Sequence, residues 1–119
     1  MNYNPYIEKA VKNAKQSKAY HRAPKQEKIT AEKYGGYLTP KSGAGIKKGD
    51  VDVKNILRIE CKTTQKKSFS ITLEMLKKIE NATIANSQTP AIIVEFLDAN
   101  GKPIYEVAVV PTYVLEDLQ

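Results

Sequence analysis

The chain has 119 residues, 41% of them hydrophobic, and a net charge of +6, values that fit one globular domain with a basic surface. No apolar run approaches the roughly 20 residues of a membrane helix, and the polar, lysine-rich start lacks the apolar stretch of a secretory signal. A single Cys excludes an internal disulfide, and one Cys with one His cannot build a structural zinc site, so we expect a cytoplasmic protein.

Residues 1–25 are expected to form a basic N-terminal arm before a folded domain of residues 26–119. Asn4 and Pro5 are typical of a helix start, and residues 20–25, which contain Pro24, are predicted to be a linker. Residues 1–33 carry seven Lys and one Arg against three Glu, whereas the remainder carries 11 basic and 10 acidic groups. This imbalance predicts a polyanion partner, most simply nucleic acid, and a solvated tail is the alternative.

Helices and strands alternate through the domain. The first half is expected to contain a helix over 26–34 ended by glycines, a short strand over 37–40, a Gly- and Lys-rich loop over 41–49, and a hairpin of strands 50–53 and 57–64. A helix over 73–86 is expected after Ser70 or Thr72, with its buried face at Leu73, Leu76, Ile79, Ala82 and Ala85. A strand over 91–97 buried on both faces, an Asn-Gly turn, a strand over 104–110 and a short helix over 112–118 are expected to follow. Helices on both sides of a mixed sheet predict an α/β domain, with helix 73–86 crossing over between parallel strands.

The first hairpin carries the most informative residues. Strand side chains alternate, so Glu60 and Lys62 point to one face while Ile59 and Cys61 point to the other. Asp50 on the neighbouring strand can reach Glu60, and two carboxylates would then converge beside an ammonium group. Two carboxylates can hold Mg²⁺, and a lysine beside the metal can orient or deprotonate a water and offset charge on a phosphate under attack.

Several motifs occur together over residues 25–97, and their combination resembles the PD-(D/E)xK nuclease superfamily. The motifs are an acidic helix residue, a Ser-Gly loop at 41–45, Gly49-Asp50-Val51, and Glu60-Cys61-Lys62 on a strand. Within the superfamily they are most similar to the small Holliday-junction resolvases of phages and archaea. The resemblance implies a restriction-endonuclease-like fold, a mixed central β-sheet flanked by helices, with the active site at one sheet edge. A bare Glu-x-Lys is common by chance, but the combination is not.

The resemblance also implies a set of residue roles. Asp50, Glu60 and the backbone carbonyl of Cys61 would bind Mg²⁺, for which Mn²⁺ could substitute, and Lys62 would position the attacking water. Glu27 would complete the acidic cluster. Glycine stands at position 49 where the family has proline before its aspartate.

Two of these assignments have rivals in the chain. Asp52 lies two residues after Asp50 and is predicted to share its face, so either could be the metal ligand. Glu32 lies about one helical turn after Glu27. Glu27 itself could instead be a charge that complements the helix dipole at a helix N-terminus.

The expected function is structure-selective cleavage of DNA. A four-way junction has two-fold symmetry and needs paired nicks, so a homodimer acting on branched DNA is predicted, held by phosphate contacts rather than base reading. The alternatives are another nuclease of the same superfamily, acting on duplex or flapped DNA, and a non-catalytic DNA-binding protein. The candidate DNA contacts, each of which could also be an ordinary loop or solvated residue, are Ser42, Lys41, Lys47, Lys48, Lys66, Lys67 and Arg22.

Overall fold

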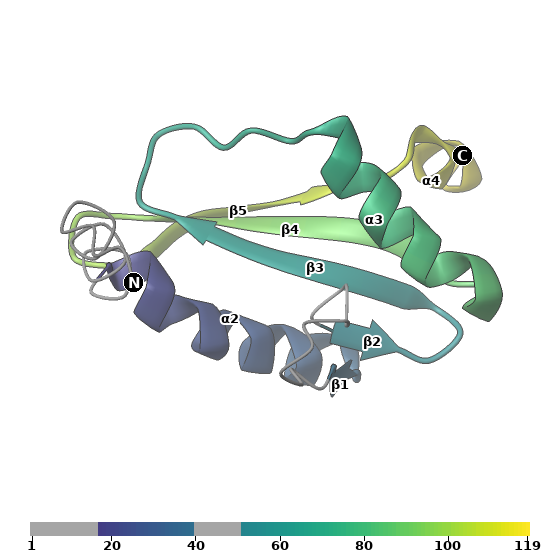
Figure 1. Cartoon of the computed structure of the whole chain (residues 1–119), viewed down its shortest axis with the longest axis horizontal. Coiled ribbons are helices and arrows are strands. Elements are labelled where there is room, and N and C mark those ends of the chain that lie inside the picture. The colour runs from purple at the N-terminus through teal and green to yellow at the C-terminus, as the bar shows by residue number, and fades with distance from the viewer. Residues whose placement is uncertain (1–16, 40–50) are drawn as a thin grey trace, which may run out of the picture.

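The computed structural model describes residues 17–39 and 51–119 and has a mixed α/β architecture (Figure 1). Its elements in chain order are α2 (Lys18–Tyr34), β1 (Tyr37–Leu38), β2 (Val51–Val53), β3 (Leu57–Thr64), α3 (Leu73–Thr83), the 3-10 turn η1 (Ile84–Asn86), β4 (Thr89–Leu97), β5 (Pro103–Val109) and α4 (Thr112–Asp117). The predicted α/β class is therefore confirmed. The N-terminal helix predicted from Asn4 and the loop predicted over 41–49 lie outside the described residues.

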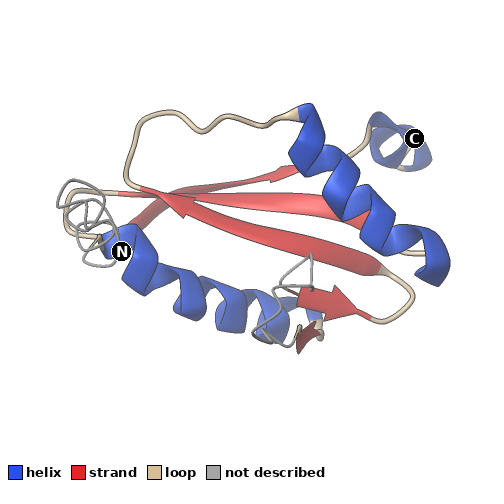
Figure 2. Cartoon of the chain, in the orientation of Figure 1, coloured by secondary structure: helices blue, strands red, loops and turns tan. Residues whose placement is uncertain are grey.

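The five strands form one sheet in the order β1-β2-β3-β4-β5. Only β3 and β4 run parallel, and α3 makes the crossover between them, as predicted. α2 lies along one face of the sheet and α3 crosses the other (Figure 2). β3, the strand that carries Glu60 and Lys62, is thus the central strand between two helical layers.

α2 is longer than the sequence predicted, and the expected linker over 20–25 is wrong. Ser17 caps the helix by accepting a hydrogen bond from the Tyr20 N–H at 3.0 Å. Pro24 lies inside the helix, where it removes one backbone hydrogen bond and normally costs about 3 kcal/mol. Arg22 before the proline and Gln26 after it both bind the sheet, to Glu95 and to backbone carbonyls. These tertiary contacts hold both halves of the helix in place across Pro24.

Two glycines end α2 and begin the sheet, as the sequence indicated. Gly35 has the left-handed φ of 68° that closes the helix. Gly36 lies against β2 so closely that a Cβ there would be 2.9 Å from the Asp52 carbonyl oxygen and from methyl groups of Val51 and Val53. Position 36 therefore needs glycine for close packing of the helix end on β2.

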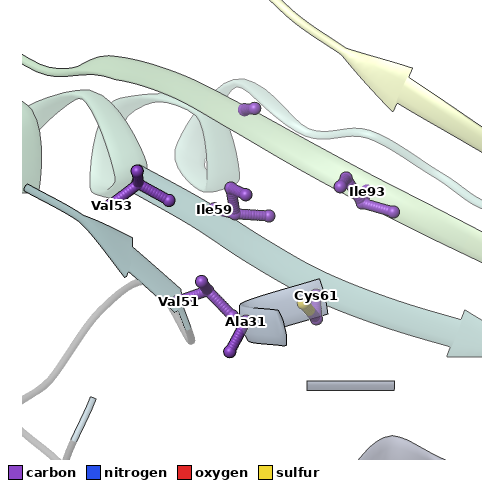
Figure 3. Packing of buried hydrophobic residues seen from close by; sticks show 7 residues of the cluster. Ala31, Val51, Val53, Ile59, Cys61 and Ile93 are labelled. Atoms are coloured by element: carbon purple, nitrogen blue, oxygen red, sulfur yellow. The ribbon is translucent and has the colours of Figure 1, made fainter. Parts of the chain in front are cut away.

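A hydrophobic core fills the space between α2 and the sheet (Figure 3). Ala31 of α2 meets the inward side chains of three strands, and every member is at most 8% exposed. The members are Ala31, Val51, Val53, Ile59, Cys61, Ala91 and Ile93. The alternation of Ile59 and Cys61 with Arg58 and Glu60 follows from the period-two geometry of a strand, so the predicted hairpin and its two faces are confirmed.

A second core lies between α3 and the opposite face of the sheet. Its buried members are Ile79, Ile92 and Val94. The buried face predicted for the helix is only partly right, because Ile79 is buried while Leu73 is 66% exposed. Met75 packs against this core instead, since α3 crosses the strands obliquely and only a short part of its apolar stripe meets the sheet.

The C-terminal part matches the prediction closely. β4 is buried on both faces and ends at an Asn-Gly turn in which Gly101 has a φ of 82°. Asp98 accepts hydrogen bonds from the Asn100 and Lys102 N–H groups and so closes the turn. β5 follows as an edge strand whose residues are mostly exposed.

Candidate active site

Glu60 and Lys62 project from the same face of β3, as predicted. They stand beside Ile92 and Val94 of β4 in the parallel register, so these side chains share the α3 side of the sheet. Lys62 Nζ lies 3.3 Å from Glu60 Oε1, and the two side chains are 38% and 26% exposed. A carboxylate and an ammonium group are therefore adjacent and accessible to solvent on the sheet surface.

The outer edge of β3 is open beside this pair in the part of the chain that the structure describes. β2 pairs with β3 from Val53 to Val51, which lies opposite Ile59, and from Glu60 onward the described pairing of β3 is with β4 alone. Among the described residues, the pair therefore lies beyond the point where β3 pairs with β2. Asp50 directly precedes Val51 in the sequence.

Several predicted site residues lie outside the described residues. They are Asp50, Lys41, Ser42, Lys47 and Lys48. Their expected placement around Glu60 and Lys62 stays a prediction, and so does the phosphate contact expected of Ser42.

Asp52 shares the face of Glu60, as predicted, but both of its oxygens already bind protein donors. Oδ2 accepts from Arg58 Nη1 at 3.1 Å, directly across the hairpin, and Oδ1 accepts from Gln88 Nε2 at 2.5 Å. Gln88 also donates to the backbone carbonyls of Val53 and Leu57, so it ties the hairpin to the start of β4. Because its charge and hydrogen-bonding capacity are used within the fold, Asp52 is the weaker candidate for a metal ligand, and Asp50 is favoured.

Glu27 occupies the buried side of α2, whereas Glu32 on the same helix is exposed. The helix begins at Lys18, so Glu27 lies in its middle and the helix-dipole role considered for it is wrong. Glu27 comes from the helix that covers the Ile59 and Cys61 side of the sheet, while Glu60 points to the other side. The two carboxylates therefore approach β3 from different layers.

Cys61 is buried in the α2-side core, as predicted from strand alternation. The role expected of its backbone carbonyl as a metal ligand stays a prediction. The neighbouring carbonyl of Lys62 accepts a hydrogen bond of 2.8 Å from Gln26 Nε2, which also reaches the Ile93 carbonyl at 3.4 Å. Gln26 is 1% exposed, so this buried amide fixes the backbone of β3 at Lys62.

Arg22, expected to contact DNA, binds another protein residue. Its guanidinium donates two hydrogen bonds to the Glu95 carboxylate, and this pairing raises the pKa of Arg22 above its ordinary value. Thr63 adds a third donor to Glu95 at 3.4 Å. The structure thus gives Arg22 a role in holding α2 on the sheet.

Lys66 and Lys67 are exposed just beyond the end of β3. They line a hollow of about 560 Å³ with residues of the β4–β5 turn, among them Asp98 and Tyr105. Both ammonium groups are therefore available to a polyanion, in agreement with the expectation for them, although contact with DNA stays a prediction.

No group of three or more His, Cys, Asp or Glu side chains that could hold a metal occurs within residues 17–39 and 51–119. Comparisons with models of known protein families, with curated proteins and with solved structures found no match. The resemblance to the nuclease superfamily therefore rests on the sequence motifs alone, and the structure establishes a mixed α/β sheet flanked by helices. Among the described helices, none is long and apolar enough to cross a membrane.

Sequence reasoning missed the structural roles of three residues, although it had named Arg22 as a candidate DNA contact. Gln26 holds the β3 backbone, Gln88 holds Asp52, and Arg22 pairs with Glu95. Gln26 and Arg22 are four residues apart, the spacing of one helix face, and continuing the predicted helix back through Pro24 would have aligned them. No comparable sequence pattern indicates the role of Gln88. It directly follows Ser87, whose backbone has a left-handed φ of 52°.

Proposed function

We propose that this protein is a metal-dependent endodeoxyribonuclease that cuts branched DNA, most specifically a resolvase of four-way junctions. The observation that carries the proposal is the accessible Glu60–Lys62 pair on β3, at the point where β2 begins its pairing directly after Asp50. A carboxylate and a lysine on one strand, with an aspartate directly before the adjacent strand in the sequence, are the groups that phosphodiester hydrolysis with Mg²⁺ needs.

The donor atoms fit Mg²⁺ in kind. Glu60 offers a partly exposed carboxylate, and Asp50 and the Cys61 carbonyl would add the hard oxygen ligands that this ion prefers. The described residues alone do not complete such a site, so the proposal requires Asp50 to lie opposite Glu60. When bound, Mg²⁺ would supply charge neutralisation at the scissile phosphate.

Lys62 has two tasks in this proposal. Its ammonium group would donate hydrogen bonds to a non-bridging phosphate oxygen and so stabilise the charge that builds there. It would also orient the attacking water for in-line displacement, a positioning role that depends on a fixed backbone. Gln26 provides that fixed backbone through its hydrogen bond to the Lys62 carbonyl. The Lys62 ammonium group lies 3.3 Å from the Glu60 carboxylate in this structure.

A second candidate function is DNA binding without cleavage. It is favoured by one observation, the contact of 3.3 Å between Lys62 Nζ and Glu60 Oε1, in which each charge has a partner within the protein. Under this reading Glu60 and Lys62 form an ordinary surface ion pair, which contributes at most about 1 kcal/mol to stability.

Paired nicks across a four-way junction would need two active sites, so we propose a two-fold symmetric homodimer. The candidate interfaces are the N-terminal arm and the C-terminal hairpin of β4 and β5. β5 is an edge strand, and its Ile104 and Tyr105 side chains are 65% and 67% exposed. Exposed strand edges readily pair with another chain. Light scattering coupled to size-exclusion chromatography measures the mass, and a purely monomeric species at assay concentrations would contradict the dimer.

The deciding experiment is a substrate panel assayed with Mg²⁺, with Mn²⁺ and with EDTA. A four-way junction, a flap, a duplex and a single strand are incubated with the purified chain. We expect metal-dependent paired nicks in the junction, with weaker or no cutting of duplex. Cleavage of flap or duplex in preference to the junction would indicate another nuclease of this type, and no cleavage with either metal would favour the non-catalytic reading.

Substitutions then connect the activity to the site. Lys62→Ala is expected to lower junction cleavage by about 10²- to 10⁴-fold while junction binding remains measurable. Lys54→Ala is the matched control, because it removes the same charge from an exposed position in the turn before β3. Full cleavage by the Lys62 variant would overturn the proposed mechanism.

A further inference from the structure

A basic hollow lies where the start of α2 meets the β4–β5 turn, and its lining includes neither Glu60 nor Lys62. It has a volume of about 350 Å³, within the range of about 300–1,000 Å³ typical of small-ligand pockets. Its walls are the first turns of α2 and the turn between β4 and β5, and its lining residues are Lys18, His21, Arg22, Lys25, Asn100, Gly101, Lys102 and Pro103. None of the described lining residues is acidic.

The four α2 residues of this hollow follow one face of the helix. Lys18, His21, Arg22 and Lys25 are spaced i, i+3, i+4, i+7. The first turn of α2 contains no acidic residue to complement the helix dipole. An anion in the hollow would meet this end of the helix and the ammonium groups of Lys18 and Lys25.

Two of the cationic side chains are held by their surroundings. Gly101 packs on the Lys18 stem so closely that a Cβ there would lie 3.0 Å from the Lys18 Cβ. Arg22 is anchored by its two hydrogen bonds to Glu95. The hollow therefore joins α2 to the β4–β5 turn as one surface, and its shape does not depend on freely moving lysines alone.

The surrounding acidic groups do not neutralise the hollow. Glu95 is committed to Arg22. Asp98 lies near Lys18 and Lys102, and the Lys102 N–H is the strongest of the influences that lower the pKa of its carboxyl. Glu106 also acts electrostatically on Arg22. Within the described residues, the three carboxylates of Glu95, Glu106 and Asp98 face four basic lining residues, so an excess of positive charge remains.

We infer that this hollow binds a backbone phosphate of DNA, so that it grips a substrate arm outside the cleavage site. Lysine ammonium groups on two elements suit phosphate oxygens as point charges, and the hollow's open surface offers no set of buried donors that would read a base. The inference rests on the proposed function for its substrate class. It adds Lys18, Lys25 and Lys102 to the DNA contacts, and His21 lines the same surface.

The test compares two double variants of the full chain that lose the same charge from the same helix. Lys18→Ala/Lys25→Ala removes two lining residues. Lys28→Ala/Lys33→Ala removes two exposed lysines of α2 that do not line the hollow. Fluorescence anisotropy measures the Kd of a labelled four-way junction in EDTA at several salt concentrations, and circular dichroism checks that each variant is folded.

We expect the Lys18/Lys25 variant to raise the junction Kd at least tenfold and to reduce the salt slope by about one to two. The control is expected to change the Kd by less than threefold. Lys102→Ala, on the other side of the hollow, should raise the Kd by about threefold to tenfold and so repeats the test independently of α2. Equal effects of the two double variants, or no effect of either, would overturn the inference.

Competition arms distinguish the source of the phosphate. A mononucleotide or inorganic phosphate should displace the junction no better than sodium chloride of equal ionic strength, and tight displacement by either would identify a small-ligand site and overturn DNA binding here. A four-way junction made of RNA is a further competitor, and tighter binding of RNA than of DNA would likewise contradict the inference. If the wild type cleaves no substrate but the Lys18/Lys25 variant binds the junction more weakly, the inference about the hollow holds and the nuclease proposal fails. If the wild type cleaves the junction and the Lys18/Lys25 variant binds it as tightly as the wild type does, the nuclease proposal holds and the inference about the hollow fails.

Discussion

Arg22 and Glu95, 73 residues apart in the sequence, form a two-point hydrogen bond that fastens α2 to the central sheet. The distances are 2.8 Å from Nε to Oε1 and 3.1 Å from Nη2 to Oε2, and the Glu95 side chain is only 4% exposed. The pair lies one turn before Gln26, whose amide binds the β3 backbone at Lys62. These contacts therefore fix α2 to the β3 backbone at Lys62 and hold the start of the helix beside the basic hollow.

Removing Arg22 should destabilise the protein strongly. Arg22→Ala would leave the buried Glu95 carboxylate without its charge partner, which typically costs about 3–5 kcal/mol of unfolding free energy. Arg22→Lys keeps the charge but loses the two-point geometry, so we expect an intermediate loss. Urea unfolding at neutral pH measures both, and a change under about 0.5 kcal/mol in the alanine variant would contradict this role.

The two aspartates at the start of the hairpin should respond differently to substitution. Asp50→Asn is expected to abolish metal-dependent cleavage and to leave stability nearly unchanged. Asp52→Asn should keep cleavage but lower stability by about 1–3 kcal/mol, because Arg58 and Gln88 lose a charged partner. Junction cleavage and urea unfolding of both variants make the comparison. The reverse pattern would make Asp52 the metal ligand.

Glu27 should contribute to cleavage less than Glu60 does, because it approaches β3 from the other layer. We expect Glu27→Gln to lower the cleavage rate by about 10- to 100-fold, the size typical of a group that supports a metal ligand. Glu60→Gln should lower it by about 10³-fold or more. Glu32→Gln, an exposed change on the same helix, is the control. Wild-type activity in the Glu27 variant would remove it from the site.

Asp98 should make the β4–β5 hairpin sensitive to acid. The hydrogen bond from the Lys102 N–H, reinforced by that from Asn100, lowers the pKa of Asp98 below its ordinary value. A folded-state pKa below the unfolded value of about 3.9 means that the ionised form contributes stability above this pH, and that this contribution is lost as the pH falls through the folded value.

The measurement for Asp98 is the stability difference between the wild type and Asp98→Asn. The wild type should be the more stable protein at about pH 6, and the difference should shrink as the pH falls below about 4. Using the difference cancels the titration of the other carboxylates. A difference that stays constant over this range would show that the turn does not depend on the Asp98 charge.

Local rules in the sequence predicted most of the secondary structure. The hairpin that carries Glu60 and Lys62, the glycine end of α2, the crossover helix after Thr72 and the doubly buried β4 all follow from alternation, capping and apolar runs. These features depend on neighbours a few residues away in the chain, so local sequence patterns are enough to predict them. The Glu60–Lys62 adjacency on β3 belongs to the same class.

Only the tertiary structure decided the features that join distant segments. Pro24 indicated a linker because its local cost is real, yet Arg22 and Gln26 bind the sheet on either side of it and outweigh that cost. The sequence left Asp52 as a rival to the favoured Asp50, and only the fold shows that Gln88, 36 residues away, occupies an oxygen of Asp52. The basic hollow likewise forms only where the β4–β5 turn meets α2. Contacts of this kind depend on how elements pack in three dimensions, which no local spacing encodes.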